Sequence, residues 1–295
     1  MDFASVYQYI KDLGGSNFFT ACAGAYAGAY GAQVIAERSK SKDELMKEIR
    51  NTNAALAVSF TIYNTLLSMK IQHVKALKET HDAQKAAILE HAKLRKLEKI
   101  PANIGLEYKT DFQTLSLPHL PVEILQKQLF EKLSLKGRAL NLTTTLAQTI
   151  SSLDLSLEKR NRLIEMYKSS DLSQDALRTL YFGFPYGEGH VNQDYPAAVN
   201  AIYSQTDDGI FFSQLLCKDL VKHGEQLIKQ FNRKFRKGAP DVDKPDFSKA
   251  IGSKLMPPDE AYSDWLTMFV EKPKPPLSRF ERMREGWYFW DKNTS

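Results

Sequence analysis

Apolar residues recur at helical spacing along most of the chain. Two heptad positions, one followed from Ile49 to Leu77 and the other from Phe60 to Ile88, are apolar except at Lys70 and His81. The apolar members are Ile49, Leu56, Tyr63 and Leu77 at one position, and Phe60, Leu67, Val74 and Ile88 at the other. Because neither proline nor glycine interrupts this stretch, the pattern predicts one long amphipathic helix over residues 41–98.

Two more blocks show the same spacing. Apolar positions mark residues 122–169, where Gly137 is a natural point of interruption, and residues 195–237. The proline-rich connector over residues 100–121 has room for one short strand at Leu106–Tyr108. Strand patterns are nearly absent elsewhere. The three helical segments therefore predict an all-α fold, a long-helix antiparallel bundle with coiled-coil-like packing.

Two stretches contain no charged residue, Leu13–Ala36 and Asn51–Met69. A membrane-spanning helix needs about 20 mostly apolar residues, so both stretches are long enough to cross a bilayer. The residues before the first stretch, MDFASVYQYIKD, carry one lysine and two aspartates rather than a basic run. A cleaved signal peptide is therefore not expected.

The first stretch is built from small residues rather than from leucine and isoleucine. Its sequence NFFTACAGAYAGAYGAQVIA places Gly24 and Gly28 in a GxxxG spacing, which Gly31 continues. Ala25 and Ala29 lie beside this row. Small residues let helices approach closely in lipid, where no hydrophobic effect drives their association. We expect this segment to span the bilayer and to self-associate through these residues.

The second stretch permits more than one interpretation. If it spans the membrane, residues 18–36 and 52–70 form a helical hairpin. If it does not, its heptads continue into the charged helix that follows, which favours a single span; a third alternative has no span. Basic residues after the first stretch favour a cytoplasmic body. These residues are Arg38, Lys40, Lys42, Lys47 and Arg50.

The chain divides into three parts by the character of its sequence. Residues 1–36 are the expected membrane segment, residues 37–238 the helical bundle and residues 239–295 a tail. The tail is rich in proline, so it cannot continue the helices. Near its end is the aromatic sequence GWYFW, which docks on the bundle itself, on a protein or nucleic-acid partner, or at a bilayer interface. Trp287 and Trp290 are the candidates for contact with a partner.

Composition and motifs add few constraints. The 295 residues carry a formal net charge of +5, which permits contact with anionic lipid or nucleic acid without favouring either. The two cysteines, Cys22 and Cys217, are too few for a disulfide scaffold or a cysteine metal site. Phosphate-binding loops, zinc-protease motifs and nucleophile elbows are absent from the sequence. We expect no catalytic residue, metal site or cofactor, and we interpret Glu79, His81 and Asp82, which are close together on a charged helix, as solvated surface.

Two further segments are candidates for binding. Residues 181–196, YFGFPYGEGHVNQDYP, are rich in glycine and aromatic residues, as are packed corners and binding loops. The candidate partner-binding residues in this segment are Tyr186, Glu188 and His190. The run KQFNRKFRKG complements a helix dipole, or it contacts nucleic acid or anionic lipid. Its candidate anion contacts are Arg233, Lys234, Arg236 and Lys237.

The N-terminal layout resembles that of one class of bacterial membrane protein. The segment GGSNFFTACAGAYAGAYGAQVIAERSK leads into KEIRNTNAALAVSFTIYN and then into a helical body without enzyme motifs. Over residues 1–70 this architecture is similar to that of the transmembrane effectors that accompany retron reverse transcriptases in anti-phage defence. The resemblance implies an inner-membrane location and membrane damage on release from inhibition. It also implies a reverse transcriptase and its RNA–DNA product as partners.

Three functions follow as hypotheses. The first is a membrane-anchored, non-enzymatic, toxin-like effector that disrupts the inner membrane. The second is a membrane-tethered scaffold or adaptor that binds a protein or nucleoprotein partner through residues 181–196 and the aromatic tail. The third is an enzyme of unrecognised type that uses Glu188 and His190 for acid–base chemistry. The small-residue segment and the absence of enzyme motifs favour the first.

Overall fold

The computed structural model describes residues 5, 17–101, 105–135, 137–236 and 238–267. These residues are mostly helical, with one two-stranded sheet among them, so the expectation of an essentially helical protein is confirmed. The chain divides into one compact unit that ends at Pro257 and a second that starts at Pro258. The described helices of the second unit are η2 (Asp259–Tyr262), a 3₁₀-helix, and α9 (Ser263–Thr267).

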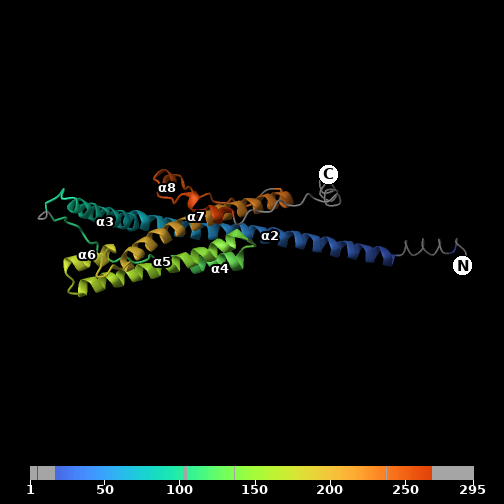
Figure 1. Cartoon of the computed structure of the whole chain (residues 1–295). Coiled ribbons are helices and arrows are strands. Elements are labelled where there is room, and N and C mark those ends of the chain that lie inside the picture. The colour runs from blue at the N-terminus through green and yellow to red at the C-terminus, as the bar shows by residue number, and fades with distance from the viewer. Residues whose placement is uncertain (1–4, 6–16, 102–104, 136, 237, 268–295) are drawn as a thin grey trace. The chain divides into compact units, whose positions relative to one another are not determined.

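One helix runs without a break from the N-terminal segment to the connector. It consists of α2 (Asn17–Met69), a π-helical turn η1 (Lys70–Val74) and α3 (Lys75–Lys96). Figure 1 shows it as the long blue to teal helix. The predicted helix over residues 41–98 is present, and it also extends back through the small-residue segment. Because no turn separates the two uncharged stretches, the alternative of a two-helix hairpin is wrong for this structure.

The second predicted block consists of two helices, α4 (Val122–Lys132) and α5 (Arg138–Ser169). They are separated at Gly137, whose φ of 63° lies in the left-handed region that glycine adopts without a Cβ clash. The connector before α4 contains no strand at Leu106–Tyr108, so that expectation is wrong. Backbone groups of the connector instead bond to side chains of neighbouring helices.

The sequence pattern did not reveal the elements between α5 and α7. α6 (Gln174–Phe182) starts after Ser173, whose hydroxyl caps its first turn, and ends at Gly183 with a φ of 66°. An antiparallel hairpin follows, made of β1 (Pro185–Tyr186) and β2 (His190–Val191). Serine and glycine at these positions are ordinary signals for the two ends of a helix, so the sequence contains the signals that predict α6.

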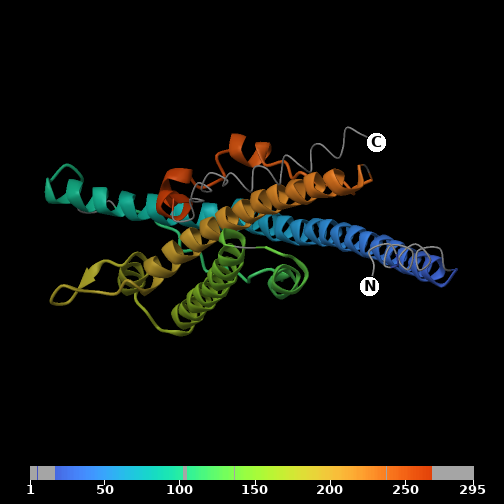
Figure 2. The same ribbon diagram turned by 90° about the vertical axis from the view of Figure 1, so that its right-hand side faces the viewer.

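The long helix α7 (Asp194–Phe235) packs against both α2 and α5 (Figures 1 and 2). It runs antiparallel to α2, since Ser59 Oγ donates to Ser213 O (3.2 Å) and, further along the same continuous helix, Lys70 of η1 pairs with Asp207 (2.5 Å). It also runs antiparallel to α5. The ion pairs that show this are Arg138–Asp219 and Lys159–Asp194.

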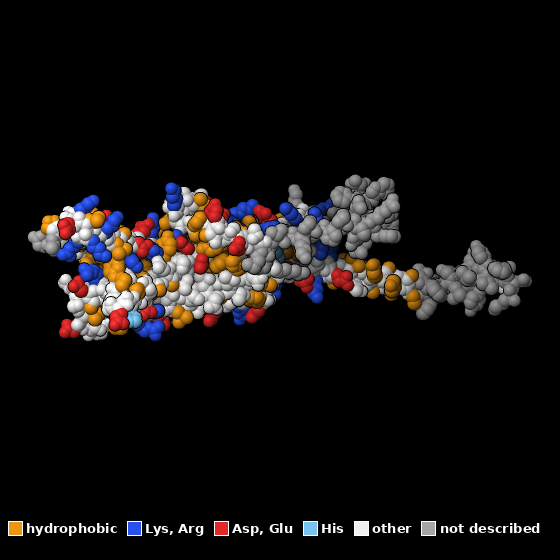
Figure 3. Space-filling model, in the orientation of Figure 1, with side chains coloured by type: hydrophobic (Ala, Val, Ile, Leu, Met, Phe, Trp, Pro, Cys, Tyr) orange, Lys and Arg blue, Asp and Glu red, His pale blue; other side chains and the backbone are white. Residues whose placement is uncertain are grey.

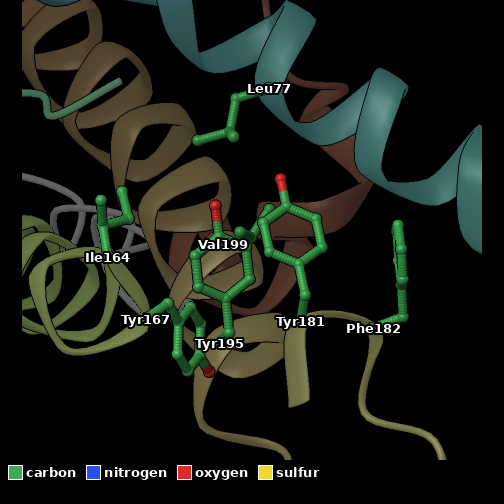
Figure 4. Close-up of a cluster of buried hydrophobic side chains, with 7 residues drawn as sticks. All are labelled: Leu77, Ile164, Tyr167, Tyr181, Phe182, Tyr195 and Val199. Atoms are coloured by element: carbon green, nitrogen blue, oxygen red, sulfur yellow. The ribbon is translucent and has the colours of Figure 1, made fainter. Parts of the chain in front are cut away.

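Buried clusters hold these helices together. An aromatic cluster joins α3, α5, α6 and α7 (Figure 4). Its buried members are Leu77, Ile164, Tyr167, Tyr181, Phe182, Tyr195 and Val199. A second cluster joins α2 to the end of α7 and consists of Leu45, Ile49, Leu227 and Phe231. The second cluster fixes the end of α7 against α2 soon after the small-residue segment.

Residues 239–257 also pack on the helices. They include the short α8 (Ser248–Gly252). Phe247 lies edge-on against Tyr63 of α2, with ring centroids 5.0 Å apart. This part of the expected tail is therefore in contact with the helical body, whereas residues 268–295 lie outside the described residues.

Candidate functional site

Residues 21–36 form an exposed, weakly apolar surface on α2. Each of these residues is exposed except Gly31, which is half-buried. Large side chains are included, since Tyr26 is 75% exposed and Ile35 is 72% exposed. Figure 3 shows apolar side chains along this end of α2, and no other element of the described chain covers them. Contiguous exposed apolar surface of this kind marks a contact with a membrane or with another protein.

The packing of the described chain does not require the small residues of this surface. A Cβ atom built on Gly24, Gly28 or Gly31 would meet no described atom within 4 Å. At Gly209 of α7, by contrast, a Cβ would lie 2.7 Å from Leu66 Cδ1, because the two helices are close there. Each glycine in an exposed helix costs roughly 1 kcal/mol relative to alanine. The candidate packing residues, which also include Ala25 and Ala29, thus lie on a surface without a neighbour among the described residues.

The second uncharged stretch has a different environment. Its buried residues include Thr52, Ala55, Leu56, Ser59, Ile62, Tyr63 and Leu66. One helix of the described chain, Ala21–Lys96, is long and apolar enough to cross a membrane, and 44% of its qualifying apolar window is buried inside the protein. Residues 51–69 pack as a core helix, in agreement with their continuing heptads. Since none of residues 21–36 is buried, that window lies in the packed second stretch, and residues 21–36 are the exposed, weakly apolar part of the same helix.

The basic end of α7 lies beside α2. Lys234 Nζ is 3.4 Å from Ser41 Oγ, only a few residues after the exposed segment. Of the candidate anion contacts, Arg233 and Lys234 are in the last turn of α7, Arg236 follows that turn, and Lys237 lies outside the described residues. The structure thus brings together two basic segments that are almost 200 residues apart in the sequence.

The hairpin presents Tyr186, Glu188 and His190 at the surface, where all three are exposed. Its register pairs His190 with Tyr186, with ring centroids 6.3 Å apart, and Glu188 is in the turn. No hydrogen bond links Glu188 to His190 among the described residues, and neither lines a described cavity. The other two candidate partner contacts, Trp287 and Trp290, lie outside the described residues.

A cavity of about 250 Å³ with a mixed polar and apolar lining lies between the η1–α3 helix and the connector. Its lining includes Gln72, His73, His81, Lys109 and Asp111. The side chain of His81 is buried, and its Nε2 is 3.2 Å from the Tyr181 carbonyl oxygen. The expectation that the stretch around His81 is solvated surface is therefore wrong for this residue, because α6 covers it.

Two stacked tyrosines hold the connector that forms one wall of this cavity. The rings of Tyr181 and Tyr195 are 4.3 Å apart, and Figure 4 shows their hydroxyl groups pointing in the same direction. The Asp111 N–H donates to Tyr181 Oη (2.9 Å), and Tyr195 Oη donates to the Asp111 carbonyl (3.2 Å). Burial raises the pKa of both tyrosines, which keeps them neutral. Arg160, fully buried, donates to the Gln113 carbonyl (2.8 Å).

The titratable groups of the described chain do not form a metal site. No three of its His, Cys, Asp or Glu side chains are grouped so that they could hold an ion. Cys217 is buried beside Ser59, and burial raises the pKa of its thiol to about 11. Cys22 is exposed within residues 21–36. Of the two thiols, the described chain covers only that of Cys217.

Comparison with known proteins gives no relative. No family model matches the chain, and no curated protein or solved structure matches it. Function is therefore inferred from the chain's own geometry.

Proposed function

We propose that this protein is a membrane-anchored, non-enzymatic effector that disrupts the bacterial inner membrane. In this proposal, residues 17–36 of α2 span the bilayer and the rest of the chain is an antiparallel helical bundle in the cytoplasm. The observation that supports it is the exposure of residues 21–36, a helix without charge that no described element covers. In this proposal, the lipid of the bilayer covers these exposed side chains.

The dimensions of the segment suit a bilayer. At about 1.5 Å per residue, Asn17–Ala36 is about 30 Å long, which equals the thickness of a typical hydrocarbon core. Basic residues follow at Arg38, Lys40 and Lys42, on the side that the proposal assigns to the cytoplasm. The buried second stretch keeps the remainder of the chain on that same side.

Self-association would turn this anchor into a toxin-like effector. A helix of alanine and glycine is only weakly apolar, so a single copy is a poor anchor. Gly24, Gly28 and Gly31 permit close approach of a second copy, with the helix backbones in contact. Several copies packed in this way would breach the bilayer, with Tyr26 and Tyr30 on the face away from the contact between the copies.

The proposed setting is anti-phage defence, with a reverse transcriptase and its RNA–DNA product as the inhibitory partners. This part of the proposal rests on the N-terminal resemblance. Co-expression with a reverse transcriptase encoded beside this gene should suppress toxicity. Equal toxicity with and without the reverse transcriptase would reject the setting and leave the proposed membrane activity standing.

Insertion can be tested with Cys22. A water-soluble maleimide should not label it in membrane vesicles, because the thiol lies in hydrocarbon, and should label it after denaturation. The control is Ser39→Cys in a Cys22→Ser background, which places the thiol just outside the proposed span. Cys217 is buried in both proteins. Equal labelling of Cys22 and of the control thiol in vesicles would reject insertion.

Membrane damage can be tested with substitutions on two faces of the segment. Gly24→Leu with Gly28→Leu should abolish entry of a membrane-impermeant dye on expression, because bulk on the small-residue face blocks close packing. Tyr26→Leu with Tyr30→Leu has the same spacing on the opposite face and should retain more activity. Carbonate-washed membranes should contain both variants. Undiminished dye entry in the glycine variant would reject self-association through this face.

The exposed hairpin supports a second candidate, a membrane-tethered adaptor. Tyr186 and Val191 are 47% and 45% exposed, which suits recognition of a protein partner. An adaptor should be non-toxic and should co-purify with one partner in stable proportion. Replacing residues 185–191 by a short glycine-serine loop should then release that partner, whereas the effector proposal predicts unchanged dye entry.

A further inference from the structure

Basic side chains from two helices form one surface, which we name the basic collar. It consists of Arg38, Lys40 and Lys42 of α2 together with Arg233, Lys234 and Arg236 at the end of α7. All of these residues are exposed. The bond from Lys234 Nζ to Ser41 Oγ (3.4 Å) places the end of α7 beside this part of α2. Figure 3 shows basic side chains, with some acidic ones, where the apolar end of α2 meets the rest of the surface.

Helix packing fixes the basic collar in place. The buried cluster of Leu45, Ile49, Leu227 and Phe231 holds α7 on α2 within two to three helical turns of it. Phe235 continues this contact, and the guanidinium carbon of Arg38 lies 5.9 Å from the centroid of its ring. Because the backbones are held by buried side chains, the collar requires no folding step before it meets a ligand.

The position of the collar along α2 matches the depth of lipid phosphates. This step rests on the proposed function, in which residues 17–36 span the bilayer. Ser41 then lies about 7 Å beyond Ala36, at about 1.5 Å per residue. Each headgroup layer adds about 5–7 Å to the hydrocarbon core. Lys234, beside Ser41, would therefore lie at the level of the phosphate groups.

The charge of the collar is mixed on α2 and uniformly positive on α7. Residues 229–236 contain no acidic residue. On α2, Glu37 accepts a hydrogen bond from Gln33 (2.9 Å), and Glu44 is 4.0 Å from Lys40. The end of α7 therefore supplies the excess of positive charge at this level.

We propose that the basic collar binds phosphate groups of anionic phospholipids in the cytoplasmic leaflet and thereby sets the depth of the α2 span. A bilayer that holds residues 17–36 presents its phosphates to this surface, so the ligand is already at the site. A nucleic acid would have to enter the headgroup layer to reach side chains at this level. Lipid is therefore the ligand that the position of these side chains favours.

The experiment measures vesicle binding of the full-length protein. Protein in mild detergent is added to vesicles of phosphatidylcholine alone, or of phosphatidylcholine with phosphatidylglycerol, and the floating fraction is measured across a lipid titration. The test variant is Arg233→Gln/Lys234→Gln/Arg236→Gln. The matched control is Lys93→Gln/Arg95→Gln/Lys96→Gln, which neutralises the last turn of α3 instead. Circular dichroism melts establish that both variants fold like the wild type.

The expected result is a loss of lipid preference in the test variant alone. Each basic residue near an anionic surface contributes about fivefold in affinity, so the three substitutions should weaken binding to the anionic vesicles about 100-fold. Binding to the neutral vesicles should not change, and high salt should remove the difference. The control should behave like the wild type.

An unchanged preference for anionic vesicles in the test variant would overturn the inference while the anchor stands. If that variant also loses binding to a labelled RNA–DNA duplex, the collar is a nucleic-acid site instead. A failure of the wild type to float with either kind of vesicle would instead reject the proposed function, and the inference with it.

Discussion

Lys70 Nζ lies 2.5 Å from Asp207 Oδ1 in the contact between the long N-terminal helix and α7. Only 4% of the lysine side chain and 14% of the aspartate side chain are exposed. Lys70 also donates to the Leu255 carbonyl (2.8 Å), so one ammonium group joins two helices and the segment that follows α7. Burial raises the pKa of Asp207, and the adjacent ammonium opposes this shift.

Removal of Lys70 should destabilise the protein strongly. Lys70→Met leaves the carboxylate of Asp207 buried without a cation, which costs about 3–5 kcal/mol of unfolding free energy. Lys70→Met with Asp207→Leu removes both charges and should recover most of the loss. Urea unfolding of the full chain in mild detergent, followed by circular dichroism, measures both. Lys75→Met, in an exposed pair with Glu79, should cost less than about 1 kcal/mol. A double variant no more stable than the single one would contradict this account.

Lys70 and His81 show what the heptad pattern can predict and what it cannot. Both were exceptions in otherwise apolar positions, and both are buried. Their partners lie on elements distant in sequence, Asp207 on α7 and the Tyr181 carbonyl on α6. The helices themselves follow from local spacing and from glycine and proline. The buried polar contacts do not, because they depend on which helices lie side by side and in what register.

The candidate site also has one part that local spacing predicts and one part that depends on how the helices pack. The small-residue face was visible in the sequence because its spacing is local to one helix. The proximity of Lys234 to Ser41 was not, because it depends on the antiparallel register of α7 on α2. That register is set by buried contacts such as Ser59 with Ser213, which no local pattern encodes.

Leucine should have opposite effects at two helical glycines. Gly209→Leu forces a side chain into space occupied by Leu66, and overpacking of this kind costs about 1–3 kcal/mol or more. Gly28→Leu meets no described atom within 4 Å, and the change from glycine should favour the helix by up to about 1 kcal/mol. Thermal unfolding of both variants in detergent measures the difference. A Gly28→Leu protein as destabilised as Gly209→Leu would show that residues 21–36 are packed within the monomer.

Alkaline pH should destabilise the fold through Cys217. The unfolded thiol ionises near pH 9.0, whereas burial raises the folded pKa to about 11. Because the folded pKa is the higher one, this contribution is fully present below pH 9.0 and is lost as pH rises towards 11. A shift of two pKa units corresponds to about 2.7 kcal/mol. The fall in unfolding free energy between pH 8 and about pH 11 should therefore be about 2–3 kcal/mol smaller in Cys217→Ala than in wild type. Cys22→Ala is the control, and equal falls in all three proteins would contradict the assignment.

Arg160 should control how firmly the connector is held against the helices. Its guanidinium donates to the Gln113 carbonyl (2.8 Å) and lies 3.5 Å from the Asp111 carboxylate. Charged hydrogen bonds contribute about 1.5–3 kcal/mol each, so Arg160→Met should raise local opening of the connector about 10–100-fold. The rate of trypsin cleavage after Lys109 measures this opening. The Lys109 side chain is exposed, but its backbone N–H donates to Gln84 Oε1 (3.0 Å) while the connector is held.

The control for this prediction is Arg162→Met, which changes an exposed arginine on the same helix. It should leave cleavage after Lys109 at the wild-type rate. A tyrosine variant keeps the arginine, since Tyr195→Phe removes only the hydroxyl that donates to the Asp111 carbonyl and that also contacts Tyr181 and Arg160. It should increase cleavage less than Arg160→Met, because a neutral hydrogen bond contributes only about 0.5–1.5 kcal/mol. Equal cleavage in Arg160→Met and wild type would mean that the stacked tyrosines hold the connector without the arginine.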